Sequence, residues 1–351
     1  MQRIRVGIVG AASLTSSVLL RLLALHQQVE ITFLTSETKD GQKVEDVHRE
    51  LRGVISKRLV PYDPAEMVKR CDLVFLCKSH GEFWERTGKL IGRARRLKSR
   101  LKVIDLSADY RLQDPKLYSL WYGFEQKNTD LLKEATYGLT EIHTGRIKKA
   151  ILIANPGCYP TCVVLGVAPL FKAKIVEGIP LIVDAYSGVS GAGLRPNERN
   201  MAMSTMENIL PYCVASHPHT AEMEQELTLL SGEKVRVTFV PHVASFKYGM
   251  LANIYLKLKK KVKYEEIYRL YREFYKGKIF VRLLPKGEYP QVSDVVGTNL
   301  CEIGLVYDQR TETLIVMSVI DNLIKGGSGQ AVQNMNVMFG LDEREGLPYL
   351  P

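Results

Sequence analysis

The sequence places a cysteine at the start of an apolar segment, where its thiol could act as a nucleophile. The run Ile151–Ala154 is typical of a short buried strand, and the Asn-Pro-Gly of residues 155–157 is typical of a turn. A helix is predicted from Thr161 onward, which puts Cys158 at its N-terminus. Unpaired backbone N–H groups and the positive end of a helix dipole favour a thiolate there. A small, inert buried residue is the alternative interpretation.

Two histidines and a glutamate near a later helical stretch could move protons. His217 and His219 stand just ahead of that stretch, and Glu222 follows His219 by three residues. In a first helical turn this spacing lets the carboxylate orient the imidazole and raise its basicity. Histidine exchanges protons near neutral pH without large tuning. A surface histidine pair before a helix is the alternative, and the pattern leaves open which histidine would act.

Two further segments offer groups that bind anions. Arg111 follows a predicted strand end, and its guanidinium suits a bidentate phosphate or carboxylate contact, although a surface ion pair would use the same residue. Residues 184–196 read DAYSGVSGAGLRP, and their backbone donors could stabilise an oxyanion or simply form a turn. The predicted substrate-binding residues are Arg111, Ser187, Gly188, Ser190 and Arg195.

The N-terminal segment has the layout of a dinucleotide site. A strand predicted at Ile4–Val9 leads through Gly10 to a helix predicted at Thr15–His26, where N–H groups would meet the phosphates. The loop lacks G-x-G-x-x-G and could equally be a plain turn. At the next strand tip, hydroxyls and a lysine could hold a 2′-phosphate, whereas Glu37 suits ribose hydroxyls, so NADP is modestly favoured. The predicted contacts are Gly10, Ala12, Ser13, Leu14, Thr15, Ser16, Thr35, Ser36 and Lys39.

The composition describes a globular protein with room for two domains. Of 351 residues, 46% are hydrophobic and 25% are charged, which is ordinary for a folded protein. The six cysteines show no metal-ligand spacing and no disulfide framework, so we predict no metal. We find no membrane span and no secretory signal, and we expect a cytoplasmic protein. The net charge of +10 is scattered and lacks a nucleic-acid motif, so no nucleic-acid partner is predicted.

Strand and helix alternate over the first 155 residues, which predicts βαβ units and a Rossmann-type, doubly wound parallel sheet. This is an α/β pattern. The remaining elements predicted here are strands at Glu30–Leu34, Leu73–Cys77, Val103–Leu106 and Ile151–Ala154, and a helix at Glu82–Lys98.

Longer alternating strands follow Cys158, with helices at about 220–231 and 264–276, and predict an α+β domain with a mixed or antiparallel sheet. The final segment reads as a helix with Ala331, Met335 and Met338 on one face that packs back on the first domain. We therefore predict a nucleotide-binding domain at 1–155 with 325–351, and a catalytic and oligomerisation domain at 156–324.

These parts together fit one type of reaction. A thiol nucleophile, an imidazole, a cationic clamp and a nicotinamide site could oxidise an aldehyde through a thiohemiacetal. In the reverse direction a thioester is reduced, and an acyl phosphate is the natural source of that thioester.

Long segments, in the same order, resemble the N-acetyl-γ-glutamyl-phosphate reductase family of arginine biosynthesis, which is related to aspartate-semialdehyde dehydrogenase. The segments are VIDLSADYRLQDPKLYSLWYGFE (103–125), YGLTEI (137–142), ANPGCYPT (154–161), DAYSGVSGAG (184–193), HTAEMEQEL (219–227), FVPH (239–242) and DNLIKGGSGQAVQNMNVMFG (321–340). The resemblance implies NADPH-dependent reduction of a small-molecule acyl phosphate to a semialdehyde, with phosphate released, through a Cys158 thioester. It implies a homo-oligomer, and it adds Ser79, His80 and Asn322 to the cofactor site.

The chain departs from the family pattern in three places. Serines at 13, 16 and 17 stand where glycines are expected, Pro218 replaces a common arginine, and CKSHGE (77–82) replaces the usual A-L-P-H-G. A sister group of the family acts on glutamyl or aminoadipyl phosphate attached to an acidic amino-group carrier protein. The net charge of +10 would suit such a partner, so the carrier-bound substrate is the alternative.

Overall fold

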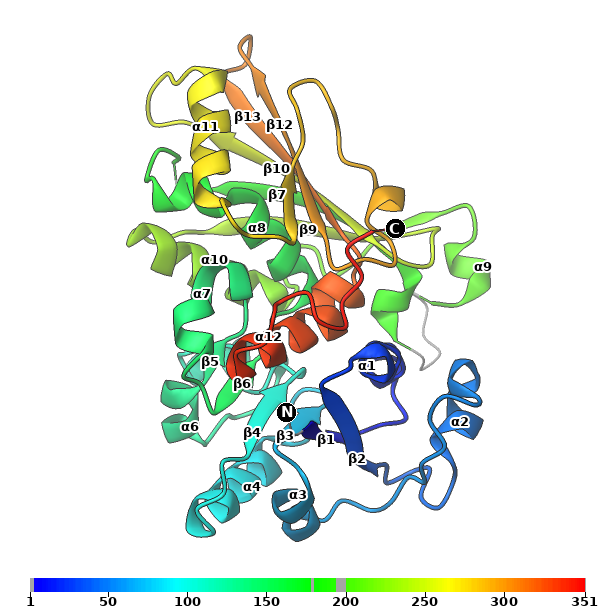
Figure 1. Ribbon diagram of the computed structural model, residues 1–351. Coiled ribbons are helices and arrows are strands. Elements are labelled where there is room, and N and C mark those ends of the chain that lie inside the picture. The colour runs from blue at the N-terminus through cyan, green and yellow to red at the C-terminus, as the bar shows by residue number, and fades with distance from the viewer. Residues whose placement is uncertain (1–2, 178–179, 194–199, 351) are drawn as a thin grey trace. The chain divides into compact units, whose positions relative to one another are not determined.

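The chain forms two compact units, each built around one sheet. The computed structural model describes residues 3–177, 180–193 and 200–350. The first unit comprises Met1–Pro156 with Gly327–Leu347, and the second comprises Gly157–Gly326 with Pro348–Pro351. Figure 1 labels the helices and strands of both.

The first unit contains a six-stranded sheet whose neighbouring strands are parallel, in the order β2-β1-β3-β4-β6-β5. The strands are β1 (Ile4–Val9), β2 (Val29–Thr35), β3 (Leu73–Leu76), β4 (Lys102–Asp105), β5 (Thr136–Tyr137) and β6 (Leu152–Ala154). Their residues are almost all buried, because helices cover both faces of a doubly wound sheet. The predicted Rossmann-type class is confirmed.

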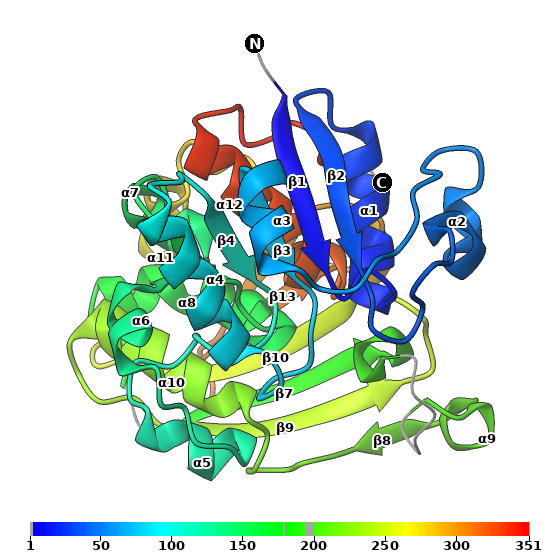
Figure 2. The ribbon, with the colours of Figure 1, turned by 90° about the horizontal axis from the view of Figure 1, so that it is seen from below.

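Three helix pairs of the first unit are in contact, and one of them joins α7 to α12. Helix α3 packs with α4, and α1 packs with α12, in separate layers around the sheet (Figure 2). Helix α3 starts with Asp63 as its N-cap and Pro64 at its first position, a standard start signal. The bounds are α1 (Leu14–Leu25), α2 (Val44–Val47), α3 (Pro64–Arg70), α4 (Trp84–Arg96), α5 (Lys116–Tyr122), α6 (Thr129–Glu134), α7 (Thr140–Ile147) and α12 (Gly329–Phe339), with a short 3₁₀ turn at Arg49–Leu51.

Buried amides, in addition to apolar residues, hold helix α12 in place. Asn334 donates to the Gly138 carbonyl at 2.7 Å and to Asn155 Oδ1 at 3.0 Å, and accepts from the Thr140 hydroxyl at 2.7 Å. The fully buried residues of α12 include Gln330, Gln333, Asn334 and Asn336. The predicted single apolar face with Ala331, Met335 and Met338 is therefore too narrow, since hydrogen bonds to other elements allow the polar positions to be buried as well.

The second unit contains a seven-stranded sheet in the order β11-β12-β13-β10-β7-β9-β8. The sheet is mixed, which agrees with the predicted mixed or antiparallel sheet. The pairs β7–β9 and β11–β12 are parallel and the others antiparallel. The strands are β7 (Leu181–Gly188), β8 (Ile209–Pro211), β9 (Val237–Ala244), β10 (Met250–Lys257), β11 (Val281–Leu283), β12 (Cys301–Asp308) and β13 (Thr313–Ile320).

Three helices of the second unit pack against its sheet. Helix α8 contacts β10 and β13, α10 contacts β9, and α11 contacts β12. The helices are α8 (Cys158–Lys172), α9 (Ala202–Thr205), α10 (His219–Ser231) and α11 (Tyr264–Phe274), with 3₁₀ turns at Val189–Ala192 and Val292–Asp294 and a π-type turn at Ile324–Ser328. Among the described residues, no helix combines the length and apolar character that a bilayer crossing requires.

Candidate active site

Cys158 is the first residue of helix α8, which begins three residues earlier than predicted. Gly157 is the N-cap, with φ −70° and ψ 158°. Pro160 did not delay the helix, because proline is tolerated in the first turn, where an N–H has no partner within the helix. Thr161 is instead the first residue to donate back, to the Gly157 carbonyl at 3.0 Å. The thiol thus lies at the N-terminal, positive end of α8.

His219 and Glu222 are packed directly against the residue that precedes the thiol. A Cβ at Gly157 would lie 2.4 Å from His219 Nε2, so only glycine leaves room for this imidazole. Glu222 is fully buried; its Oε2 accepts the Gly157 N–H at 3.1 Å, and its Oε1 lies 3.9 Å from His219 Nε2. One carboxylate therefore joins the start of α8 to the start of α10, with the imidazole between them.

His217 has a different environment from His219. Its Nδ1 accepts the backbone N–H of His219 at 3.1 Å, so its proton in the neutral form is on Nε2. Its ring lies in edge contact with Tyr159, Tyr212 and Phe239, at centroid distances of 5.5, 5.4 and 5.5 Å. His217 thus caps the start of α10, while His219 packs against Gly157, next to Cys158.

Gly326 lies against the Cβ of Cys158 within the second unit. A Cβ at Gly326 would lie 2.7 Å from Cys158 Cβ, so a larger residue there would displace the cysteine. The end of β7 and the following turn hold the predicted Ser187, Gly188 and Ser190 in the same unit. Asn322 donates to Ser190 Oγ at 2.9 Å and accepts the Gly249 N–H at 2.8 Å. Arg195 lies outside the described residues.

Asn155 is fixed by hydrogen bonds from all four of its polar groups, all within the first unit. Its N–H donates to the Asp105 carbonyl at 2.8 Å, and its carbonyl accepts from Arg111 Nε at 2.7 Å. Its side-chain amide donates to the Gly327 carbonyl at 3.0 Å and accepts from Asn334 at 3.0 Å. This accounts for the asparagine at the end of β6, which the sequence marked only as a turn.

Arg111 is buried and is engaged by backbone carbonyls. Besides Asn155, it donates through Nη2 to the Leu106 carbonyl at 3.0 Å. Two buried carboxylates from the same segment, Asp105 and Asp109, lie beside it. Burial raises the pKa of Asp105 to about 7 and also raises that of Asp109. Sequence reasoning missed both aspartates, although DLSADYR places three charged residues within seven positions.

The turn after β1 fits a dinucleotide phosphate. Gly10 has φ +79°, and a Cβ there would lie 2.4 Å from the Cys77 carbonyl oxygen, so the turn requires glycine. Ser13 caps α1 by accepting the Ser16 N–H at 3.1 Å. The buried Ser16 hydroxyl donates back to the Ser13 and Gly10 carbonyls at 2.8 and 3.1 Å. These serines thus hold the loop, and Ala12, Leu14 and Thr15 are partly exposed at the start of α1.

The other predicted cofactor residues of the first unit lie at neighbouring strand ends. Thr35 and Ser36 are buried at the tip of β2, whereas Lys39 is exposed. Ser36 Oγ accepts the Lys39 N–H at 3.2 Å. Ser79 and His80 are exposed after β3, and Asp109 holds their loop by accepting the Gly81 N–H at 2.6 Å. Asn322 is the exception, since it lies in the second unit.

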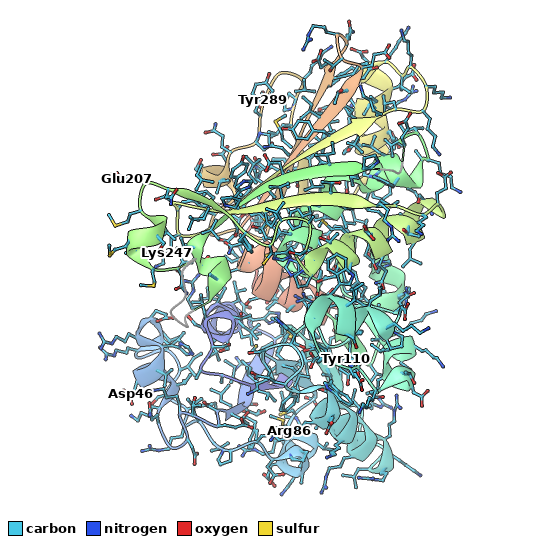
Figure 3. All side chains as sticks on the ribbon, turned by 180° about the vertical axis from the view of Figure 1, so that it is seen from behind. Asp46, Arg86, Tyr110, Glu207, Lys247 and Tyr289 are labelled. Carbon is cyan, nitrogen blue, oxygen red and sulfur yellow. The ribbon has the colours of Figure 1, made fainter. Side chains whose placement is uncertain are left out.

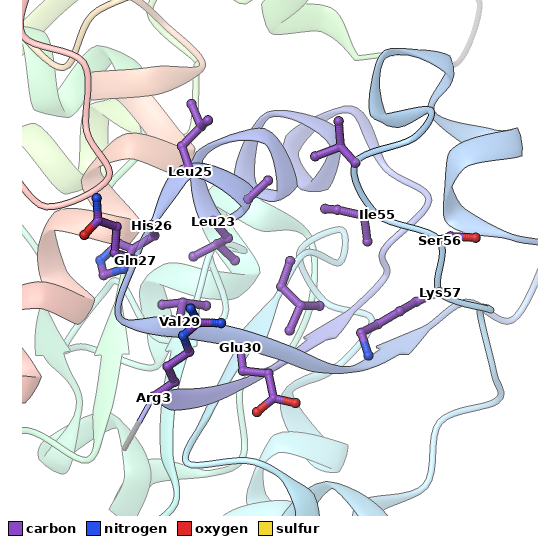
Figure 4. A pocket seen from close by; sticks show the side chains of 13 residues that line it. Arg3, Leu23, Leu25, His26, Gln27, Val29, Glu30, Ile55, Ser56 and Lys57 are labelled. Carbon is purple, nitrogen blue, oxygen red and sulfur yellow. The ribbon is translucent and has the colours of Figure 1, made fainter. Parts of the chain in front are cut away.

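A surface hollow of the first unit lies elsewhere (Figure 4). It has a volume of about 590 Å³ and is lined by the C-terminal end of α1, the start of β2 and residues 54–57. It therefore lies at the amino ends of the strands, whereas ligands of doubly wound sheets bind at the carboxyl ends. No group of three or more potential metal ligands occurs among residues 3–177, 180–193 and 200–350.

Four of the thiols are buried. Burial raises the pKa of Cys71, Cys77 and Cys162. Cys301 is also buried, Cys213 is exposed and Cys158 is intermediate. Cys158 and Cys213 are thus the two thiols that solvent can reach, whereas the other four are buried.

Comparison with known proteins agrees with this arrangement. The model of the semialdehyde dehydrogenase NAD binding domain matches residues 5–150, and that of the semialdehyde dehydrogenase dimerisation domain matches residues 158–322. A protein of Thermoanaerobacter sp. (strain X514) named N-acetyl-gamma-glutamyl-phosphate reductase is 45% identical over 99% of both chains. One of the same name from Geobacter sulfurreducens is 44% identical over 98% of both. The chain belongs to the N-acetyl-γ-glutamyl-phosphate reductase family.

Solved structures show the same fold. Aspartate semialdehyde dehydrogenase II of Vibrio cholerae, complexed with ASA, has a TM-score of 0.70 at 17% identity, covering 97% of this chain and 99% of that one. The enzyme of Candida albicans with NADP has a TM-score of 0.66 at 16% identity, covering 96% and 99%. The predicted family, its dehydrogenase class and its nicotinamide-nucleotide domain are therefore confirmed, and the relatives do not favour the carrier-protein alternative.

Gly157→Ala tests the contact between the N-cap and the imidazole. The new methyl would overlap the His219 ring, while the backbone of residue 157 is one that alanine adopts freely. We expect the rate of Cys158 alkylation by iodoacetamide at pH 7 to change by about tenfold or more, which corresponds to about 1.4 kcal/mol. Gly145→Ala is the matched control, since a Cβ at Gly145 in α7 meets nothing within 4 Å. Equal rates in both variants would contradict the assignment.

Asp105→Asn tests the buried carboxylates. Because burial raises the pKa of Asp105 to about 7, the folded chain binds this proton more tightly than the unfolded chain does. The resulting stabilisation is present below the unfolded pKa of about 4 and is lost as the pH rises through about 7. The free energy of unfolding of the unmodified protein minus that of the variant should fall between pH 4 and 7, as measured by urea denaturation. A constant or rising difference would contradict this.

Proposed function

We propose that the protein reduces N-acetyl-γ-glutamyl phosphate to N-acetylglutamate semialdehyde and inorganic phosphate with NADPH. Family membership supports the substrate. The observation that carries the mechanism is the packing of His219 and Glu222 against Gly157, one residue before Cys158. This arrangement supplies a nucleophile and a proton-transfer group on two helix starts that share a buried carboxylate.

The proposed steps begin at the thiol. Cys158 Sγ, as the thiolate, attacks the acyl carbon, and the phosphate leaves with the bonding pair to give a thioester. His219 takes the thiol proton, and Glu222 stabilises and orients the charged imidazole. Cys158 and Tyr159 form the first turn of α8 and lie at its positive end, where negative charge is stabilised. When bound, NADPH supplies the hydride that reduces the thioester.

We assign the substrate-binding residues to the second unit and most of the cofactor-binding residues to the first. We assign Ser187, Gly188, Ser190 and Arg195 to the substrate. For the cofactor, the close approach allowed by Gly10 and the N-terminus of α1 supports Gly10, Ala12, Ser13, Leu14 and Thr15. Phosphate binding by Arg111, whose guanidinium holds two carbonyls, and cofactor binding by Asn322 stay predictions, as does a cytoplasmic location.

Cys158→Ser should abolish phosphate-dependent NADP⁺ reduction with N-acetylglutamate semialdehyde while leaving NADPH binding within about twofold, because the nucleophile and the nucleotide site are separate groups. Cys213→Ser is the matched control and should retain full activity, since Cys213 is an exposed thiol. In the unmodified protein, iodoacetamide should label Cys158 faster than Cys213 although Cys213 is more exposed. Activity in Cys158→Ser, or turnover without phosphate, would refute the mechanism.

We further propose that two copies of the chain associate through the second unit. One of its matching models is named for dimerisation. Ile182 of β7 and Tyr255 of β10 are adjacent across the β7–β10 pair and are 45% and 36% exposed. Tyr186 and His242 stack nearby at a centroid distance of 4.7 Å, both only half-buried. Asp184 lies on the same side of β7, hydrogen-bonds with Tyr186 and contacts His242, so apolar and aromatic side chains surround one carboxylate. A mainly apolar and aromatic sheet face of this kind is typical of an interface.

Ile182→Glu should convert the dimer to a monomer, because a second carboxylate close to Asp184 would be buried in the interface without a cation of its own. Light scattering coupled to size-exclusion chromatography measures the mass directly. Leu25→Glu is the control, since Leu25 is 76% exposed on α1 of the first unit. A dimer that survives Ile182→Glu but not Leu25→Glu would place the interface elsewhere.

A further inference from the structure

We propose that Lys78 and Arg86 bind the 2′-phosphate of the cofactor's adenosine ribose, and that they do so by displacing their contacts with Glu37. They would thereby set a preference for NADPH over NADH at the end of β2. Glu37 alone would favour NADH there. The inference rests on the proposed function for the presence of a nicotinamide dinucleotide. It goes further in naming the groups that distinguish the two cofactors.

Three chain segments meet at one edge of the parallel sheet. Val9 at the end of β1 pairs with Thr35 of β2 on one side and with Leu76 of β3 on the other. The segments after these strands are therefore neighbours: the Gly10 turn, the tip of β2 with Glu37, and the loop that starts at Cys77. In such sheets the phosphates lie at the first segment and the adenosine ribose at the second.

Lys78 extends from the third segment toward the other two. A Cβ at Gly10 would lie 3.2 Å from Lys78 Cδ, so the aliphatic part of the Lys78 side chain packs beside the Gly10 turn. Its ammonium lies 3.7 Å from Glu37 Oε2 and 3.7 Å from Glu82 Oε2. Only 21% of the Lys78 side chain is exposed, against 51% for Glu37. The ammonium is thus held near the ribose position by its stem and by two carboxylates.

Arg86, labelled in Figure 3, lies in the first turn of α4. It bonds to the same carboxylate of Glu37. Its Nη1 donates to Glu37 Oε1. The guanidinium carbon lies 5.7 Å from the Phe83 ring centroid and 5.9 Å from that of Tyr62, which are cation–π distances. The two rings pack edge to face at 5.0 Å. The two aromatic rings therefore position the Arg86 guanidinium independently of its hydrogen bond to Glu37.

The charge balance favours a phosphate over a free carboxylate. The hydrogen bond from Arg86 and the charge of Lys78 lower the pKa of Glu37, which shows that both cations act on one point at the strand tip. A 2′-phosphate carries more charge than a carboxylate and offers three acceptor oxygens, so it competes for an arginine fork and an ammonium. Lys39, exposed on the same turn, adds a further positive charge. Without these cations, Glu37 would accept from ribose hydroxyls and repel the phosphate.

Binding measurements test this without catalysis. Dissociation constants for NADPH, NADH, 2′,5′-ADP and 5′-AMP are measured by calorimetry on the full chain. In the double variant Lys78→Ala with Arg86→Ala, we expect the ratio of NADPH to NADH affinity to fall about tenfold or more, with 2′,5′-ADP losing affinity and 5′-AMP unchanged. Glu37→Gln should raise the affinity for NADPH and lower that for NADH, since it removes the competing charge but keeps the side-chain length.

A charge-matched control and the unmodified protein complete the test. Arg96→Ala removes one positive charge ten residues further along α4, about 15 Å away, and should leave the ratio unchanged. A ratio that falls less than about threefold in the double variant, or an unmodified protein that binds NADH as tightly as NADPH, overturns the inference.

The two proposals fail separately. Phosphate-dependent turnover with NAD⁺ preferred over NADP⁺ would refute the role of Lys78 and Arg86 and the NADPH preference, while leaving the proposed acyl-phosphate chemistry at Cys158 intact. Selective 2′,5′-ADP binding that depends on Lys78 and Arg86, in a protein without turnover on the semialdehyde, would support that role and refute the reaction.

Discussion

The contact between Gly157 and the His219 ring is the constraint that fixes the surroundings of Cys158. Residue 157 must lack a side chain, because the imidazole occupies the place of its Cβ. The same residue donates its N–H to the buried Glu222 carboxylate. The position of the thiol, the orientation of the imidazole and the packing of two helix starts are therefore set by one backbone unit. A change at Cys158, His219 or Glu222 would therefore be transmitted to the other two through Gly157.

Much of the fold could be predicted from local pattern. The apolar runs of the first unit mark parallel strands because each is buried on both faces, and the alternating strands of the second unit mark a sheet with two unlike faces. The predicted start of α8 at Thr161 is three residues too late, because the first turn of a helix tolerates a proline such as Pro160. The serines of the first loop replaced glycines without disrupting it, because their hydroxyls bond to the loop carbonyls and cap α1.

The parts of the site that depend on long-range contacts could not be predicted. Nothing local to Asn155 indicates that Asn334 reaches it from the C-terminal helix, or that Arg111 would bond to its carbonyl. The sequence indicated Glu222 as a partner of His219, but its bond to Gly157 joins residues 65 positions apart. Spacing predicts partners on one helix face, whereas pairs between elements depend on how the whole unit packs.

The distribution of thiols has a consequence for oxidative damage. Sulfur is oxidised as the thiolate and where oxidants have access, so Cys71, Cys77 and Cys162, buried and with raised pKa values, are protected from peroxide. Cys158, by contrast, stands partly open at a helix start. If Cys158 is the nucleophile as proposed, an oxidant would inactivate the protein by forming a sulfenic acid there before the fold is harmed, and a thiol reductant would restore activity.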